Sequence, residues 1–311
     1  MEVFYRTHNY LVEHTNAPVR RALMDEIDWS ARLIGIKGTR GVGKTTFLLQ
    51  YAKEKFGFDR SCLFVNMNNF YFSQCSLVDF AGEFVKRGGK VLLIDQVFKL
   101  PHWSHDLRTC YEHYPNLKIV FTGSSVMRLK DENPELNGIV RSYNLRGFSF
   151  REFLNLQTGN HFSSYSLEEI LNNHEHIAKT ILPHTNPLNY FQDYIHHGFY
   201  PFFLEKRNFS ENLLKTMNMM IEVDILLIKQ IELKYLSKIK KLLYLLAVDG
   251  PVAPNVSQLA TDIQTSRATV MNYIKYLADA RLINMVYPKG EVFPKKPAKI
   301  MMHNTNLMYS I

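Results

Sequence analysis

Apolar residues recur with two different patterns of spacing along this chain of 311 residues. Between about residues 30 and 130, short apolar runs that suit buried parallel strands alternate with segments of helical spacing. The predicted strands are LIGI (33–36), CLFVNM (62–67), VLLID (91–95) and KIVFTG (118–123). Such alternation is typical of an α/β domain with a parallel sheet, which binds ligands at the carboxyl edge of its strands.

Helical spacing dominates the chain beyond residue 150. Apolar residues recur at helical intervals over residues 150–235, and Ser166 with Glu169 has the spacing of a capping box. We therefore expect a helical region over residues 156–235, following an α/β domain of residues 1–155.

Another arrangement of elements begins near residue 236. Three helical segments are followed by two short strands that meet at Pro288-Lys289-Gly290, and this order predicts a winged helix over residues 236–302. The predicted helices are KIKKLLYLLAVD, NVSQLATDI and SRATVMNYIKYLADARLI. Thr265 or Ser266 is expected to cap the last of them.

A glycine-rich stretch follows the first predicted strand. Residues 38–45, GTRGVGKT, fit the pattern G-x-x-x-x-G-K-[ST] of a phosphate-binding loop. Glycines let backbone N–H groups face phosphates, Lys44 reaches the β- and γ-phosphates, and the Thr45 hydroxyl ligates magnesium. The segment TFLLQYAK continues as a helix whose N-terminus points at the anion. The predicted nucleotide-binding residues of this stretch are Gly38, Thr39, Arg40, Gly41, Val42, Gly43, Lys44, Thr45 and Thr46.

Two later strand ends add polar groups to the same edge of the predicted sheet. VLLID ends at Asp95, which forms the predicted magnesium site together with Thr45. KIVFTG runs into two serines, so Thr122, Ser124 or Ser125 is expected near the γ-phosphate, with Ser124 taken as the nucleotide-binding residue. Turn and helix-capping chemistry is the alternative role for these hydroxyl groups.

Several motifs in order carry a resemblance to a known family. GTRGVGKTTFLLQYAKE, LLIDQVFKLPHW, IVFTGSS, RGFSFREFLNL, GFYPFF and HNTNLMY resemble a large family of bacterial and archaeal AAA-type ATPases, over nearly the whole chain. The resemblance implies an AAA domain that binds ATP and Mg²⁺, a winged-helix domain, and a C-terminal domain of unknown function that is often described as nuclease-like. In that family HNTNLMYSI leads into the C-terminal domain, so we expect residues 303–311 to begin a truncated copy of it.

Gln96 departs from the family pattern at the residue after Asp95. The family has Glu at this position and usually His two residues later, where this chain has Phe98. Gln keeps the shape and hydrogen bonds of Glu but lacks a carboxylate base, so the resemblance implies that ATP binds and hydrolysis is slow. Some GTPases orient water with Gln, which leaves turnover open. A substitution made to trap ATP and a natural divergence both account for Gln96.

The arginine that completes many AAA sites across a subunit interface also has no clear equivalent. The family often carries an Arg pair where this chain reads Gly138-Ile139. Arg141 is our first candidate for a catalytic arginine that stabilises transition-state charge, and Arg128 or Arg146 come after it. An arginine supplied in trans would require a homo-oligomer.

The charge balance is compatible with a nucleic-acid partner. Lys and Arg number 37 against 29 Asp and Glu, a net charge of +8. A DNA-binding winged helix would use the face and wing residues Ser266, Arg267, Thr269, Asn272, Lys275, Lys289, Lys295, Lys296 and Lys299. The alternative is a winged helix that serves as an intramolecular lid or a protein contact.

The remaining sequence features favour a cytoplasmic protein without a membrane partner. No apolar run reaches about 18 residues, and the N-terminal segment lacks the apolar core of a signal peptide. Cys62, Cys75 and Cys110 are scattered without a CxxC pair, which suggests reduced thiols.

These patterns together predict an AAA-type protein that binds ATP and Mg²⁺ and couples its nucleotide state to a winged helix, with hydrolysis impaired by Gln96. An active ATPase motor or loader stimulated by DNA is one alternative. A non-hydrolysing, nucleotide-gated DNA-binding or scaffold protein is another.

Overall fold

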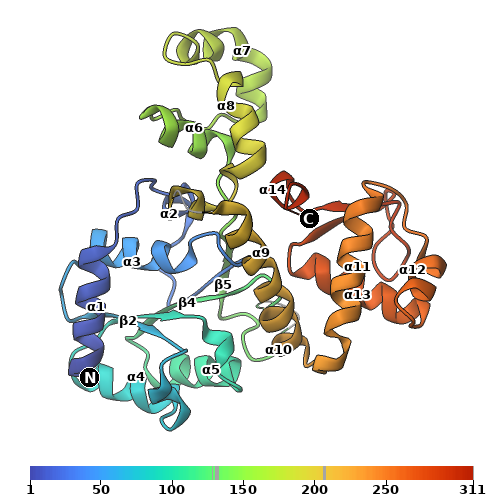
Figure 1. Ribbon diagram of the computed structural model, residues 1–311. Coiled ribbons are helices and arrows are strands. Elements are labelled where there is room, and N and C mark those ends of the chain that lie inside the picture. The colour runs from blue at the N-terminus through green and yellow to red at the C-terminus, as the bar shows by residue number, and fades with distance from the viewer. Residues whose placement is uncertain (128, 130–132, 206–207, 311) are drawn as a thin grey trace. The chain divides into compact units, whose positions relative to one another are not determined.

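The computed structural model of the protein describes all residues except 128, 130–132, 206–207 and 311. The chain divides into two compact units, Met1–Leu145 and Arg146–Ile311 (Figure 1). The division falls ten residues before the boundary that the sequence suggests. The segments 156–235 and 236–302 belong to one unit.

The first unit is built on a parallel sheet of five strands in the order β2-β3-β4-β1-β5. The strands are β1 Leu33–Gly38, β2 Cys62–Asn66, β3 Val91–Asp95, β4 Lys118–Ser124 and β5 Arg141–Asn144. Four of them confirm the sequence prediction. The fifth, β5, is short and polar, and it forms an edge strand beside β1 that the apolar pattern does not indicate.

Helices cover both faces of this sheet, which explains why its central strands are almost entirely apolar. Helices α1 (Glu2–His14) and α3 (Lys44–Lys55) lie on one face, and α4 (Leu77–Lys86) and α5 (Trp103–His113) lie on the other (Figure 1). Strand β3 is buried over its whole length. Each Leu or Ile buried in this way contributes about 1.5–3 kcal/mol relative to an exposed side chain. A short helix, α2 (Leu23–Glu26), precedes β1.

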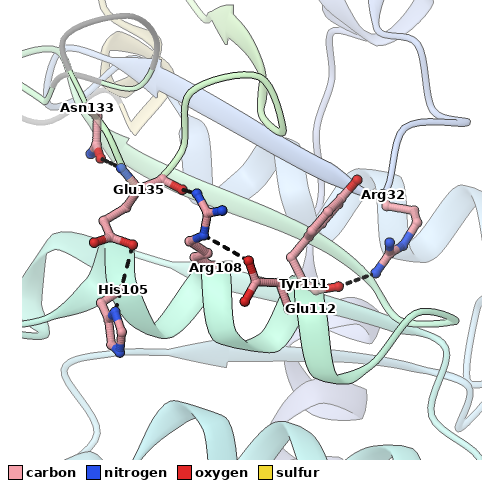
Figure 2. A network of polar contacts seen from close by, with 7 residues as sticks. All are labelled: Arg32, His105, Arg108, Tyr111, Glu112, Asn133 and Glu135. Atoms are coloured by element: carbon pink, nitrogen blue, oxygen red, sulfur yellow. Dashed lines mark hydrogen bonds and ion pairs between the residues drawn. The ribbon is translucent and has the colours of Figure 1, made fainter.

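The connection from β4 to β5 is anchored on α5 by polar contacts (Figure 2). Arg108 donates from Nη1 to the carbonyl oxygen of Glu135 at 3.2 Å and from Nε to Glu112 at 2.9 Å. On the other side of the network, Arg32 donates to the carbonyl oxygen of Tyr111 at 2.6 Å and stacks over its ring. These contacts satisfy carbonyl groups near the end of α5 and fix the approach to β5.

The second unit begins with the predicted helical region. Its elements are α6 Phe150–Thr158, α7 Leu167–Ile181, α8 Leu188–Asp193, a π-helical turn Tyr194–Gly198, a 3₁₀ turn Pro201–Glu205, α9 Phe209–Met219, a π-helical turn Met220–Ile225, α10 Leu226–Lys229 and a 3₁₀ turn Leu233–Tyr235. The predicted capping box of Ser166 and Glu169 is confirmed at the start of α7.

Three further helices and a pair of antiparallel strands follow, in the predicted order. They are α11 Leu236–Asp249, α12 Val256–Asp262, α13 Arg267–Asp279, β6 Ile283–Val286 and β7 Lys299–Met302. Of the two candidate caps, Ser266 accepts the hydrogen bond from the backbone of Thr269 at the start of α13.

The segment after β7 packs within the second unit. Asn306 is fully buried at the start of α14 (Thr305–Met308). Its amide donates to the carbonyl oxygens of Tyr194 and Ile195, and its Oδ1 accepts from Phe199 N at 3.0 Å. Residues 303–310 therefore hold the π-helical turn in place.

Candidate nucleotide-binding site

The loop after β1 has the backbone geometry that its glycines permit. Gly41 and Gly43 have φ values of 84° and 91°, in the left-handed region that side chains disfavour. A Cβ on Gly38 would collide with the carbonyl oxygen of Leu145. Helix α3 begins directly after Gly43, so the free N–H groups of its first turn lie at the loop.

Two cations contact carbonyl groups of this loop. Lys44 donates from Nζ to the carbonyl oxygens of Gly38 and Thr39, both at 2.8 Å. Arg21, which is 8% exposed, donates from Nη1 to Val42 O at 3.1 Å. Arg21 lies before β1 and outside every recognised motif, so sequence reasoning did not select it.

Asp95 lies at the centre of the site and is 1% exposed. Its Oδ2 accepts from Thr45 Oγ1 at 2.9 Å and from Asn66 Nδ2 at 2.8 Å, and its Oδ1 accepts from Thr122 Oγ1 at 2.6 Å. The parallel register places Asn66 directly beside Asp95 at the ends of β2 and β3. Three donors from three elements therefore fix the plane of this carboxylate.

Thr45 and Asp95 together fit a magnesium ion. Mg²⁺ prefers oxygen ligands in octahedral geometry at about 2.0–2.1 Å, which separates neighbouring ligands by about 2.9 Å. The Thr45 Oγ1 and Asp95 Oδ2 atoms lie 2.9 Å apart. In the part of the chain that the structure describes, no three His, Cys, Asp or Glu side chains cluster as a metal site. An ion at Thr45 would therefore share its coordination with phosphate oxygens and water, as Mg²⁺ commonly does.

Gln96 adopts a left-handed backbone conformation, with φ 58° and ψ 46°. This conformation costs a non-glycine residue about 1–2 kcal/mol. The Gln96 N–H donates to Thr122 Oγ1 at 3.0 Å, so the hydroxyl that holds Asp95 also fixes the residue after it. Phe98 follows in a 3₁₀ turn, Val97–Lys99, and is buried.

The three candidate sensor hydroxyls occupy different positions. Ser124 is 2% exposed and lies in register with Gly38, so it is adjacent to the start of the loop. Thr122 contacts Asp95 and Gln96 instead. The Oγ atom of Ser125 is buried without a hydrogen-bond partner in the described part of the chain.

Within the first unit, Arg141 lies away from this loop. Arg141 begins β5 beside Ile34, whereas the loop leaves β1 at Gly38, roughly 13 Å further along the strand. Arg146 belongs to the second unit, and Arg128 lies outside the described residues.

The structure thus brings together the predicted residues of the loop and α3 with Asp95, Gln96 and Ser124. It adds Asn66 and Arg21, which sequence reasoning missed. Asn66 ends a predicted strand one position before Met67, and its alignment with Asp95 becomes visible only when β2 and β3 are paired.

Two family descriptions match separate parts of the chain. Residues 30–154 match a family described as an AAA domain. This part of the chain is similar to AAA-type P-loop domains. Residues 188–308 match a domain of unknown function, which covers α8 to α14. Nucleotide binding is the property that AAA domains share, and the loop of residues 38–45 lies within the matched range.

The chain is similar to a curated protein and to a solved structure. An uncharacterized protein of Methanocaldococcus jannaschii is 29% identical over 278 residues, which cover 85% of this chain and 58% of that protein. The chain therefore spans little more than half of that relative. A structure of C. elegans PCH-2 matches 55% of this chain and 46% of its own, at 16% identity and a TM-score of 0.31.

Among the described residues, every helix is too short or too polar to cross a lipid bilayer.

Proposed function

We propose that this protein binds ATP with Mg²⁺ at the loop of residues 38–45. The observation that carries the proposal is the pairing of Thr45 with Asp95 at 2.9 Å, directly after a loop whose two left-handed glycines open its backbone to phosphates. Lys44 and the amides of the loop bind the phosphates, and Thr45 and Asp95 hold the metal. When bound, Mg²⁺ neutralises phosphate charge.

Hydrolysis at this site is expected to be slow. Gln96 occupies the position from which a carboxylate would accept the proton of the attacking water. Its backbone is fixed by Thr122, so its amide can orient a water molecule, but an amide is not an efficient base. Loss of a general base typically costs a factor of about 10²–10⁴ in rate. Arg141 would assist only from a second copy of the chain, because it lies at the other end of β1 from its own loop.

The order of elements from α11 to β7 supports a winged helix, and we propose that this segment responds to nucleotide binding. Three helices and an antiparallel pair of strands occur in the order that a winged helix requires. We propose that nucleotide binding in the first unit changes the contacts that this segment makes with a partner.

A second candidate function is a non-hydrolysing protein whose DNA binding is gated by nucleotide. Lys289, Lys296 and Lys299 are exposed and form no ion pair with any described residue, so they are available to phosphates. Arg267 and Asn272 are exposed on α13. By contrast, Lys275 pairs with Asp279 at 2.9 Å and Lys295 pairs with Glu291 at 3.1 Å, which reduces the charge that they offer.

A paired assay on the full chain tests these functions. ATP affinity with Mg²⁺, and phosphate release with and without duplex DNA, are measured for the chain with Gln96 and for Gln96→Glu. Lys44→Ala is the control that removes phosphate binding. Binding by both chains with turnover only in Gln96→Glu supports an ATPase arrested at one residue.

Binding by both chains without turnover in either supports the nucleotide-gated binding protein, provided that ATP changes DNA affinity. Absence of Mg²⁺-dependent ATP binding in the chain with Gln96 would overturn the proposal.

A further inference from the structure

Helix α7 lacks the buried face that an amphipathic helix normally has. All fifteen of its residues are described, and none of them is buried. Leu167 and Leu171 are 72% and 68% exposed, and Ile170 is also exposed. Single exposed leucines are ordinary on a protein surface, but these three side chains have the i, i+3 and i+4 spacing of neighbours on one helix face. The helix therefore carries an apolar patch that its own unit leaves uncovered.

The apolar positions continue into the second half of the helix. The backbone of Asn173 leaves the helical conformation, with φ −131°, and separates an N-terminal half (167–172) from a C-terminal half (174–181). In the C-terminal half, Ile177 and Ile181 follow at helical spacing and are half-buried. The apolar stripe is thus open in the N-terminal half and partly covered in the C-terminal half.

The two halves of α7 carry opposite charges. Glu168 and Glu169 lie in the first turn, and Lys179 lies in the last turn. Glu168 and Lys179 are about three turns apart, which puts them on the same side of the helix. Both side chains are exposed, and neither forms an ion pair with another described residue. Their charges are therefore available to a partner.

A second copy of α7 in the antiparallel direction complements both the apolar stripe and the charges. It would place the open N-terminal half of each helix against the C-terminal half of the other. Glu168 of each copy would then face Lys179 of the other copy, and two-fold symmetry would form this pair twice. A parallel arrangement would place Glu168 against its own equivalent, which like-charge repulsion disfavours.

The charges of α7 do not suit a membrane surface. Helices that lie on anionic lipid carry Lys and Arg on the polar face beside the apolar stripe. In α7 the polar residues include three glutamates and a single lysine. The apolar patch is therefore better matched by protein than by lipid.

We propose that α7 is a self-association surface through which two copies of this chain form an antiparallel, two-fold symmetric dimer. A helix of fifteen residues is about 22 Å long, so the interface lies at the small end of the range for specific complexes. The dimer is accordingly weak and forms as the protein concentration rises. The surface belongs to the second unit and does not depend on ATP binding at the loop of residues 38–45.

Sedimentation equilibrium of the full chain tests the proposal without nucleotide and at low ionic strength. We expect the dimer fraction to rise with concentration, equally in the chain with Lys44 and in Lys44→Ala. Leu171→Gln should raise the dissociation constant at least tenfold, because each dimer loses two apolar side chains from its interface. Leu233→Gln is the matched control, since Leu233 is another exposed leucine of the second unit and lies outside α7.

A charge exchange tests the antiparallel direction. Lys179→Glu alone sets acid against acid and should weaken the dimer about fivefold at low ionic strength. Addition of Glu168→Lys to this variant should restore the affinity to within about twofold. Both substitutions oppose the dipole of α7, so a more stable helix would not explain the recovery.

Several outcomes would overturn the proposal. One is a monomer at every concentration without nucleotide, even if ATP assembles the chain through the first unit. Others are a dimer that a folded Leu171→Gln leaves unchanged, and an exchanged pair that fails to recover affinity. Binding of the chain to vesicles that contain phosphatidylserine, lost in Leu171→Gln, would identify the patch as a membrane contact instead. ATP binding is measured separately, so failure of either proposal is recognised by itself.

Discussion

Asn66 and Thr45 donate to the same oxygen of Asp95. The two distances are 2.8 and 2.9 Å, and the donors come from β2 and α3. The oxygen that faces the predicted metal is thus positioned by a side chain that lies outside both recognised motifs. The Oδ1 atom of Asn66 also accepts from Asn68 N at 2.8 Å, which fixes its amide in one orientation.

Asn66→Ala should weaken Mg²⁺-dependent ATP binding. A hydrogen bond to a charged acceptor contributes about 1.5–3 kcal/mol, so we expect a loss of roughly tenfold or more in affinity. Titration of ATP with and without Mg²⁺ measures the effect. Asn68→Ala is the matched control, because its exposed side chain is removed while its backbone donor remains. Equal affinities for Asn66→Ala and Asn68→Ala would contradict the positioning role.

Thr122→Val should destabilise the first unit and disturb Gln96. The substitution keeps the shape of a fully buried side chain but removes its hydroxyl, which donates to Asp95 and accepts from Gln96 N. An unpaired buried donor costs about 1–3 kcal/mol, and we expect a loss of this size in the free energy of unfolding. Denaturant unfolding measures it, and Thr122→Ser, which retains the hydroxyl, should recover most of the stability. Similar values for Val and Ser at this position would show that the hydroxyl is not responsible.

The apolar runs predicted the central sheet because strands buried on both faces leave a direct signal in sequence. Strand β5 leaves no such signal. Its residues RSYN are half-exposed and polar, and the strand exists because β1 offers it an edge. Short edge strands of this kind are decided by tertiary pairing and not by local preference.

The same distinction between local sequence signals and tertiary pairing applies to the residues of the site. The residues of the glycine-rich loop were predictable, since their spacing is set by local backbone geometry. Asn66 was not, because its role arises from the order of strands in the sheet, which a single sequence does not reveal. Asn306 is a similar case in the second unit, where a fully buried amide holds a turn more than 100 residues earlier in the chain.

Gly43→Ala should abolish ATP binding and should also lower the stability of the first unit. Gly43 has φ 91° at the start of α3, and a side chain there costs about 1–2 kcal/mol while also obstructing the approach of phosphates. Gly57→Ala is a matched control, because Gly57 has φ 57° with open space around it. Both variants should lose similar stability in denaturant unfolding, and only Gly43→Ala should lose ATP binding. Retained ATP binding in Gly43→Ala would contradict the proposal that this loop binds the nucleotide.

His8 should make the stability of the first unit depend on pH. It is 1% exposed, its Nδ1 accepts from Phe64 N at 3.0 Å, and burial lowers its pKa to about 4. Protonation in the folded state would have to displace that backbone donor. Because the unfolded chain binds a proton near pH 6.5 and the folded chain does not, the contribution of His8 is complete above pH 6.5 and is lost as pH falls toward 4.

The loss amounts to at most about 3 kcal/mol, from a change of roughly 2.5 units. The free energy of unfolding is measured between pH 4 and 8 for the wild-type chain and for His8→Gln, which cannot titrate. The difference in the free energy of unfolding between the wild-type chain and His8→Gln should shrink steadily below pH 6.5. His303 contributes a slope of the same sign in the second unit, and it cancels in this difference because both chains carry it. A difference that stays constant with pH would show that His8 is protonated equally in the folded and unfolded chains.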